Sequence, residues 1–271
     1  MISGESFVPV EQSSTKHYED CAHIFSRIAH SKYGIKLSDQ TLTNWVEALG
    51  LMRFIDTALD DGSAIERDST LVFLEALFNE GQVDGVSKNF VNPDLAARAE
   101  SLFAKITPEA ASNFLRKGKQ LLRAEARLDS KNSSTAEAAF IKRLGGQITV
   151  GMLLAVTDSS DMQHENFGQF TKTIRRLTRI ANVFDDSLDL KRDYKEGKTM
   201  VRPTNFNRTK IMYGCRDDII FCAKELGFGV LKIAKINVDA ITKEARGKRI
   251  DRTVGVRQND DILAEVLVFG Q

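Results

Sequence analysis

Aspartates within one short stretch of the chain have the types and spacing most able to do chemistry. Asp185, Asp189 and Asp193 recur at four-residue intervals, with Asp186 and Asn182 interleaved. On an α-helix, where each residue turns by about 100°, these five side chains fall within an arc of roughly 100°. Like charges placed in this way destabilise an isolated helix. A chain that keeps them on one face is therefore expected to hold divalent cations there.

Carboxylate oxygens are ligands that suit Mg²⁺, which takes one or two carboxylates and completes its shell with water and substrate phosphate. The alternative is a solvated acidic surface, as many acidic clusters are. A second cluster, earlier in the chain, favours the metal, and the pair predicts about two or three Mg²⁺ ions. The predicted ligands are Asp56, Asp60, Asp61, Asp185, Asp186, Asp189 and Asp193, and the predicted catalytic residues among them are Asp56, Asp60 and Asp189.

Composition limits the classes of protein that this chain can belong to. Its 271 residues carry a net charge of +1, which gives no support for broad electrostatic binding of nucleic acid or of an acidic membrane surface. No apolar run approaches the roughly 18 residues of a membrane span, and the polar start lacks the apolar run of a signal peptide. Three cysteines form neither a metal-binding spacing nor an even disulfide set. The sequence predicts a cytoplasmic protein.

Helical patterns dominate the chain, which has only four prolines and few strand patterns. We expect an all-α fold, with a flexible arm over residues 1–14 and a single helical domain over residues 15–271. Cap signals such as Ser38 and stop signals such as Gly197 mark the ends of long helices. Helices are expected at about 15–33, 39–61, 70–79, from 93, 108–128, 135–155, 166–196, 210–226, 230–246 and 260–268.

An apolar helix face runs into each acidic cluster, from residues 45–52 toward Asp56 and from residues 167–178 toward the later aspartates. Packed core is the ordinary meaning of such a stripe. A core stripe, however, should not continue into aligned carboxylates, so we expect part of each face to contact a substrate. The predicted contacts are Trp45, Leu49, Met52, Phe167 and Asn182.

Basic residues and a pair of glycines accompany the acidic clusters. The adjacent Gly145 and Gly146 fall inside a predicted helix, where each glycine costs about 1 kcal/mol relative to alanine. They indicate a kink, a backbone that passes close to a ligand, or close packing of two helices. The candidates for binding a phosphate group are Arg53, Arg143, Arg179 and Lys198.

If both acidic faces line one cavity, its mouth carries seven carboxylates. These cannot all stay ionised without cations, because like charges raise one another's pKa. Mg²⁺ ions that bridge both clusters to a diphosphate would resolve this, with basic side chains on the remaining oxygens. The apolar walls would take a hydrocarbon tail, and aromatic faces such as Trp45 and Phe167 would stabilise a carbocation. An isoprenoid diphosphate fits this description, since it joins a diphosphate to a hydrocarbon tail.

Two motifs of the chain resemble those of the class I terpenoid synthase superfamily. Arg53-x-x-Asp56-x-x-x-Asp60-Asp61 is similar to its first aspartate-rich motif, especially in squalene and phytoene synthases. The stretch from Asp185 to Lys198 is similar to the second. The resemblance implies a helical bundle around a central apolar cavity, dependence on Mg²⁺, and ionisation of an allylic prenyl diphosphate of about C10 to C20 size. A homodimer is common in the families that the chain resembles.

Departures from the family patterns bear on the type of reaction. The region after the first cluster has one arginine, Arg67, where chain-elongating synthases have a pair, and no tyrosine follows Tyr213 to form the late Arg–Tyr pair of cyclases. The function expected from the resemblance is a terpene synthase that cyclises or rearranges the carbocation. The alternative is a prenyltransferase that couples the prenyl unit to a second prenyl or other acceptor.

Two hypotheses lie outside this superfamily. An all-α, Mg²⁺-dependent nucleotide pyrophosphohydrolase also uses acidic helix motifs, although these are usually rich in glutamate rather than aspartate. A helical protein without catalytic activity could use the acidic faces to bind a basic partner or simply to face solvent. Hydrolysis of a nucleoside triphosphate identifies the first, and indifference of thermal stability to Mg²⁺ with pyrophosphate identifies the second.

Overall fold

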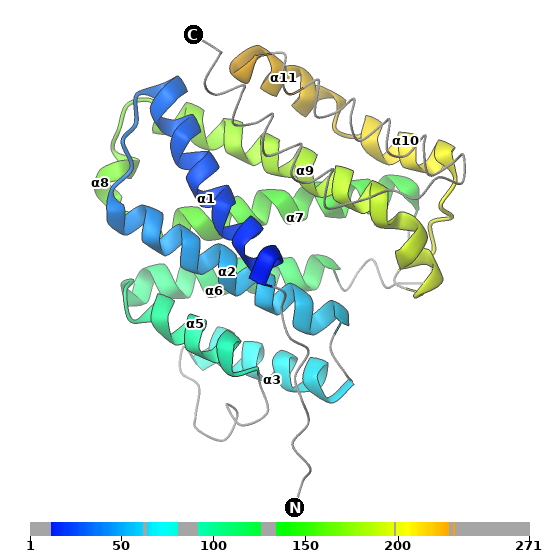
Figure 1. Ribbon diagram of the computed structural model, residues 1–271, viewed down its shortest axis with the longest axis horizontal. Coiled ribbons are helices and arrows are strands. Elements are labelled where there is room, and N and C mark those ends of the chain that lie inside the picture. The colour runs from blue at the N-terminus through cyan, green and yellow to red at the C-terminus, as the bar shows by residue number, and fades with distance from the viewer. Residues whose placement is uncertain are drawn as a thin grey trace, which may run out of the picture. The chain divides into compact units, whose positions relative to one another are not determined.

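Every element of the described chain is an α-helix, as the ribbon of the computed structural model shows (Figure 1). The all-α prediction is therefore confirmed for this part of the protein, which contains no strand. None of its helices is long and apolar enough to cross a membrane. The structure describes residues 12–61, 64–80, 92–125, 134–197, 199–227 and 230.

The chain divides into two compact units, which are described separately. The boundaries between the units fall inside three of the helices, so neither unit is a continuous piece of chain. That residues 15–271 form a single domain stays a prediction. Unit 1 comprises Met1–Ser26, Lys36–Lys119 and Gly151–His164, and unit 2 comprises Arg27–Ile35, Gln120–Val150 and Glu165–Gln271.

Unit 1 is organised around helix α2 (Asp39–Asp61), which packs against α3 (Ala64–Glu80) and α5 (Pro93–Phe103). The unit also contains the first part of α1 (Gln12–Tyr33) and most of α6 (Pro108–Glu125). A single turn, α8 (Ser159–Met162), follows α7 (Thr135–Ala155).

Local side-chain chemistry explains where the helices of unit 1 begin. The hydroxyl of Ser38 accepts a hydrogen bond from Thr41 N at 3.2 Å, and the amide oxygen of Asn92 accepts one from Asp94 N at 2.9 Å. Thr107 Oγ1 caps α6 in the same way through Ala110 N. These bonds satisfy backbone N–H groups that have no partner inside the helix, and they confirm the predicted starts.

Unit 2 is organised around the long helix α9 (Phe167–Lys195), which packs along α10 (Asn205–Tyr213) and α11 (Arg216–Leu226) (Figure 1). Most of α7 belongs to the same unit. Gly34 and Gly197 adopt left-handed φ angles of 68° and 74° after α1 and α9, as glycines that end helices commonly do.

Some predicted boundaries are wrong. The predicted helix over residues 210–226 is two helices, because the chain turns at Gly214, whose Cα faces Ala139 of α7; an added Cβ would lie 3.4 Å from Ala139 Cβ. Helix α3 begins six residues before its predicted start at Thr70, and α1 begins at Gln12 rather than residue 15. The helices predicted at 230–246 and 260–268 lie outside the described residues, apart from residue 230.

Candidate functional site

The first acidic cluster lies at the end of α2 in unit 1. Asp56 forms an ion pair with Arg53 one helical turn earlier, with 2.5 Å between Arg53 Nη1 and Asp56 Oδ2. The guanidinium group of Arg53 also lies over the ring of Tyr18, 5.6 Å from its centroid. A predicted phosphate ligand therefore contacts a predicted metal ligand directly. Asp60 and Asp61 form the last turn of α2, and their side chains lie outside the described part of the structure.

The apolar residues predicted to contact a substrate are buried within their units. Trp45 is fully buried, and its indole N–H donates to Leu153 O and to Thr157 Oγ1, each at 3.0 Å. Leu49 and Met52 are buried beside it on α2. These are the contacts of core residues, and the predicted contact with a hydrocarbon tail stays a prediction. Phe167 of unit 2 is likewise buried, with its ring against Phe170.

The second acidic cluster lies on the C-terminal half of α9 in unit 2. Three of its carboxylates, on successive turns, are paired with basic side chains. Lys142 Nζ of α7 lies 3.0 Å from Asp186 Oδ1, and Arg192 lies 2.8 Å from Asp189 Oδ2 and 3.5 Å from Asp193 Oδ1. The remaining predicted ligand, Asp185, is exposed. We call Asp186, Asp189 and Asp193 the acidic face.

Burial gives Asp186 an unusual titration. The carboxyl group is only 22% exposed, and this burial raises its pKa from 3.8 to about 6. That value includes a lowering of the pKa by the Lys142 ammonium group and smaller increases from the negative charges of Asp193 and Asp189. The influence of both aspartates on Asp186 shows that the three carboxylates share one electrostatic environment.

The acidic face offers the donor chemistry that Mg²⁺ requires, namely several carboxylate oxygens in one place. Among the described residues, however, no three His, Cys, Asp or Glu side chains are already placed to hold a metal ion. Lys142 and Arg192 occupy the carboxylates instead. The residues fit Mg²⁺ in kind, and a metal ion would have to displace these basic groups. The predicted Mg²⁺ stays a prediction.

The glycine pair of α7 lies where this helix contacts α9. A Cβ added to Gly146 would lie 2.8 Å from Thr178 O and 2.9 Å from Arg179 N, both backbone atoms of α9. A Cβ at Gly145 would meet only the side chains of Asn182 and Leu121, at 3.5 Å. Of the three explanations of this pair, close helix packing is confirmed, and α7 runs unbroken through it.

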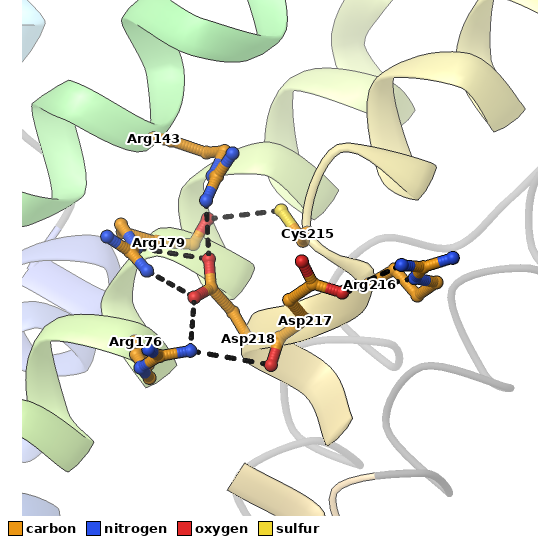
Figure 2. Close-up of polar contacts among 7 residues, drawn as sticks. All are labelled: Arg143, Arg176, Arg179, Cys215, Arg216, Asp217 and Asp218. Carbon is orange, nitrogen blue, oxygen red and sulfur yellow. Dashed lines mark hydrogen bonds and ion pairs between the residues drawn. The ribbon is translucent and has the colours of Figure 1, made fainter. Parts of the chain in front are cut away.

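Beside this contact, three arginines surround one buried carboxylate (Figure 2). Asp218 of α11 is 1% exposed and pairs with Arg143 of α7 at 3.3 Å and with Arg176 of α9 at 3.2 Å. Arg179 of α9 binds it through two nitrogens, Nε at 3.0 Å and Nη2 at shorter range. We call these four residues the arginine cluster.

Sequence reasoning identified half of the arginine cluster. Arg143 and Arg179 were predicted to bind phosphate, whereas Arg176 and Asp218 were not singled out. Asp218 begins a helix beside another acidic residue, Asp217, and nothing in that spacing distinguishes the buried aspartate from the exposed one. Lys198, the remaining basic candidate, lies outside the described residues.

Two thiols beside the cluster are held in their protonated form. Burial, together with a smaller effect from the negative charge of Asp218, raises the pKa of Cys215 and of Cys222 to about 12. Because the thiolate is the reactive form, both cysteines should resist alkylation near neutral pH while α11 is folded. Their reactivity therefore reports on the integrity of this region.

In metal-free buffer with EDTA, Asp186→Asn is expected to change how stability depends on pH. Because the pKa of Asp186 is raised to about 6 in the folded state, the wild type loses stability as the pH rises from about 4 to about 6. A shift of roughly two pH units corresponds to on the order of 3 kcal/mol. Asparagine does not ionise, so the variant escapes this loss. As the pH rises from about 4 to about 7, the free energy of unfolding of the variant, measured in urea, should therefore increase by about 2–3 kcal/mol relative to that of the wild type.

Asp158 provides a control of opposite sign for this prediction. The hydroxyl and backbone N–H of Ser160 donate to its carboxylate and lower its pKa. The ionised Asp158 carboxylate therefore stabilises the fold above its unfolded pKa, and this stabilisation is lost as the pH falls. Asp158→Asn should be less stable than the wild type at neutral pH and equally stable in acid. Parallel pH curves for the wild type and Asp186→Asn would contradict the raised pKa of Asp186.

Comparison with known proteins identifies no relative of the chain. No protein-family model, no curated protein and no solved structure matches it. The function of the acidic face and the arginine cluster is therefore inferred from their own residues and from the two acidic motifs.

Proposed function

We propose that the chain is a Mg²⁺-dependent enzyme that ionises an allylic prenyl diphosphate and releases diphosphate, as class I terpenoid synthases do. The observation that carries the proposal is the arrangement on α9, where the acidic face and part of the arginine cluster lie on one side of a single helix. At about 100° per residue, Arg179, Asp186, Asp189 and Asp193 fall within an arc of roughly 80°. A diphosphate bound to metal ions needs both kinds of group in reach.

Each group on this side of unit 2 has a chemical role in the proposal. Asp186, Asp189 and Asp193 would hold Mg²⁺, with Asp185 of the same helix as a further candidate ligand. In unit 1, Asp56, Asp60 and Asp61 are further candidate ligands. Mg²⁺ would neutralise the charge that develops on the departing diphosphate. Arg143 and Arg179 have N–H groups beyond those bound to Asp218, and these can donate to diphosphate oxygens. Lys142, once displaced from Asp186, remains close enough to contribute a positive charge.

The reaction is tested by incubating the purified protein with geranyl, farnesyl and geranylgeranyl diphosphate, with and without Mg²⁺. Extracts are analysed by gas chromatography–mass spectrometry, and released pyrophosphate is measured. A cyclic hydrocarbon or alcohol formed from one substrate alone supports a terpene cyclase. Release that requires a second prenyl or other acceptor supports a prenyltransferase instead. No release from any prenyl diphosphate, together with hydrolysis of a nucleoside triphosphate, would overturn the proposal in favour of a pyrophosphohydrolase.

Thermal stability is expected to respond to Mg²⁺ mainly when pyrophosphate is also present. Lys142 and Arg192 compete with the metal for the acidic face, and an added diphosphate gives these cations another partner. Saturating a site at a hundred times its Kd stabilises the folded state by about 2.7 kcal/mol. For a chain of this size that is a rise in Tm of roughly 5–10 °C, measurable by differential scanning fluorimetry.

The separate additions are the controls for this measurement. Mg²⁺ alone should shift Tm much less than the combination, because the metal then has to break both ion pairs without compensation. Equal shifts with Mg²⁺ alone and with the combination would mean that no diphosphate takes part. A complete lack of response would favour the hypothesis of a non-enzymatic helical protein.

A further inference from the structure

We infer that the arginine cluster is an anion-binding site that takes a diphosphate group without any metal ion. The first argument is charge. Three guanidinium groups meet one carboxylate, and Asp218 is the only acidic side chain that the described residues bring to them. The cluster thus keeps an excess of two positive charges.

Within the described part of the chain, no acidic side chain other than Asp218 forms an ion pair with these three guanidinium groups. Asp217, the next residue along α11, has an exposed side chain that pairs with Arg216, and only its backbone carbonyl accepts a hydrogen bond from Arg176. Glu225, two turns further along α11, accepts a hydrogen bond from Tyr33. Two excess charges held near each other at a partly buried position repel one another, and an anion would relieve that repulsion.

The cluster also has hydrogen-bond donors to spare. A guanidinium group carries five N–H donors, and Asp218 accepts through only two oxygens. The Nε atom of Arg143 is buried and has no hydrogen-bond partner among the residues that the structure describes. Buried N–H groups are nearly always satisfied by protein or by ordered water, so this N–H is a further donor that Asp218 does not satisfy.

The guanidinium groups are both held in place and accessible. Arg179 binds Asp218 through two nitrogens, a geometry that fixes its plane. Arg176 lies over the ring of Phe221, 4.4 Å from the centroid. The side chains of Arg143, Arg176 and Arg179 are nevertheless 34%, 28% and 19% exposed. A ligand in solution can therefore reach groups that are already oriented, which lowers the entropic cost of binding.

Phosphate oxygens match this arrangement better than a single carboxylate does. Guanidinium groups bind phosphate through paired, parallel hydrogen bonds, and a diphosphate carries enough negative charge to offset the excess of the cluster. The role of such binding in a catalytic cycle rests on the proposed function, whereas the binding itself requires neither a metal ion nor a prenyl group.

The test is calorimetric titration of the whole chain with inorganic pyrophosphate in EDTA at low ionic strength. We expect saturable binding by the wild type, and about tenfold weaker binding by Arg143→Gln and by Arg176→Gln, since each removes a charge-assisted donor. Both arginines contact Asp218 at one point, so Arg179 continues to pair with it in these variants. Unchanged resistance of Cys215 and Cys222 to alkylation verifies that the region remains folded.

Arg216→Gln is the matched control, because Arg216 is an exposed arginine of the same helix end that pairs with Asp217 instead. It should bind pyrophosphate as the wild type does. Absence of binding by the wild type, or equal affinity in Arg143→Gln, Arg176→Gln and the wild type, overturns the inference. Farnesyl diphosphate and ADP are added as competitors. Displacement by either one supports the site and identifies the source of the diphosphate, and displacement by neither overturns it.

This experiment separates the inference from the proposed function. Turnover of a prenyl diphosphate with Mg²⁺, in a protein that fails to bind pyrophosphate in EDTA, overturns the inference and leaves the proposed function standing. The opposite result is metal-free binding that both arginine variants weaken, in a protein that turns over no prenyl diphosphate. That result supports the inference and overturns the proposed function.

Discussion

Asp189→Ala is expected to lower the rate of Mg²⁺-dependent diphosphate release from a prenyl diphosphate by at least about a hundredfold, because it removes the central carboxylate of the acidic face. Such a loss corresponds to about 2.7 kcal/mol of transition-state stabilisation. The release is followed as pyrophosphate formed at saturating substrate, with Mg²⁺ varied. A higher Mg²⁺ requirement for the residual activity is expected as well, since a ligand has been lost.

The fold should tolerate this change. Asp189 is 16% exposed, and its partner Arg192 is 45% exposed and one turn away. Because the guanidinium group of Arg192 is solvent-exposed, water screens the pair, which contributes about 1 kcal/mol or less. Removing the middle carboxylate also relieves repulsion from Asp186 and Asp193. Urea unfolding in EDTA should therefore show a change in stability of less than about 1 kcal/mol, so a large loss of activity cannot be attributed to unfolding.

Asp217→Ala is the control for Asp189→Ala. It also removes an aspartate paired with an arginine, Arg216, at a comparable distance of 3.1 Å, but on an exposed part of α11. Its activity should match that of the wild type. Full activity of Asp189→Ala would contradict the assignment of the acidic face as a metal site.

The first acidic cluster can be tested through the same activity. If Asp56 and Asp189 act on the same substrate, the losses in Asp56→Ala and in the double variant should be strongly non-additive, because either change alone already disables the metal–diphosphate complex. Additive losses would mean that the two clusters act independently. Asp56 is paired with Arg53 one turn away, so its removal, too, should leave the fold intact.

Features that depend on local chemistry were predictable from the sequence. Ser38, Asn92 and Ser134 carry side-chain oxygens that accept hydrogen bonds from the first turn of the following helix, and such caps act within three residues. Gly34 and Gly197 stop helices because a left-handed φ angle is cheap only for glycine. The periodicity of the acidic face likewise follows from spacing alone.

Features that depend on packing between helices were not predictable. Lys142 and Arg143 are neighbours in the sequence, yet one pairs with Asp186 of α9 and the other with Asp218 of α11. Adjacent helix positions point about 100° apart, so which acidic residue each one meets is decided by the placement of α9 and α11. The break between α10 and α11 at Gly214 was likewise not predicted, and there the glycine lies beside Ala139 of α7. The pairings of Arg53 with Asp56 and of Arg192 with Asp189, each at a spacing of three residues, could have been expected from helix geometry.

Gly146→Ala is expected to lower both stability and activity, because it places a methyl group where the backbone of α9 passes. The nearest atoms, Thr178 O at 2.8 Å and Arg179 N at 2.9 Å, belong to the main chain and cannot rotate away. Overpacking of this kind costs roughly 1–3 kcal/mol, and the gain in helix propensity returns at most about 1 kcal/mol. We expect a net loss of about 1–2 kcal/mol in urea unfolding.

Gly145→Ala is the matched control, one residue away on the same helix. Its Cβ would meet side chains of Asn182 and Leu121 at 3.5 Å, which is an ordinary contact, so the variant should be unchanged or more stable by up to about 1 kcal/mol. Activity should likewise fall in Gly146→Ala and be retained in Gly145→Ala. Gly146→Ala must push α7 from α9, and this moves Lys142 and Arg143 away from their partners. A displacement of about 1 Å can cost a hundredfold in rate, so equal stability and activity in the two alanine variants would show that this helix contact does not position the site.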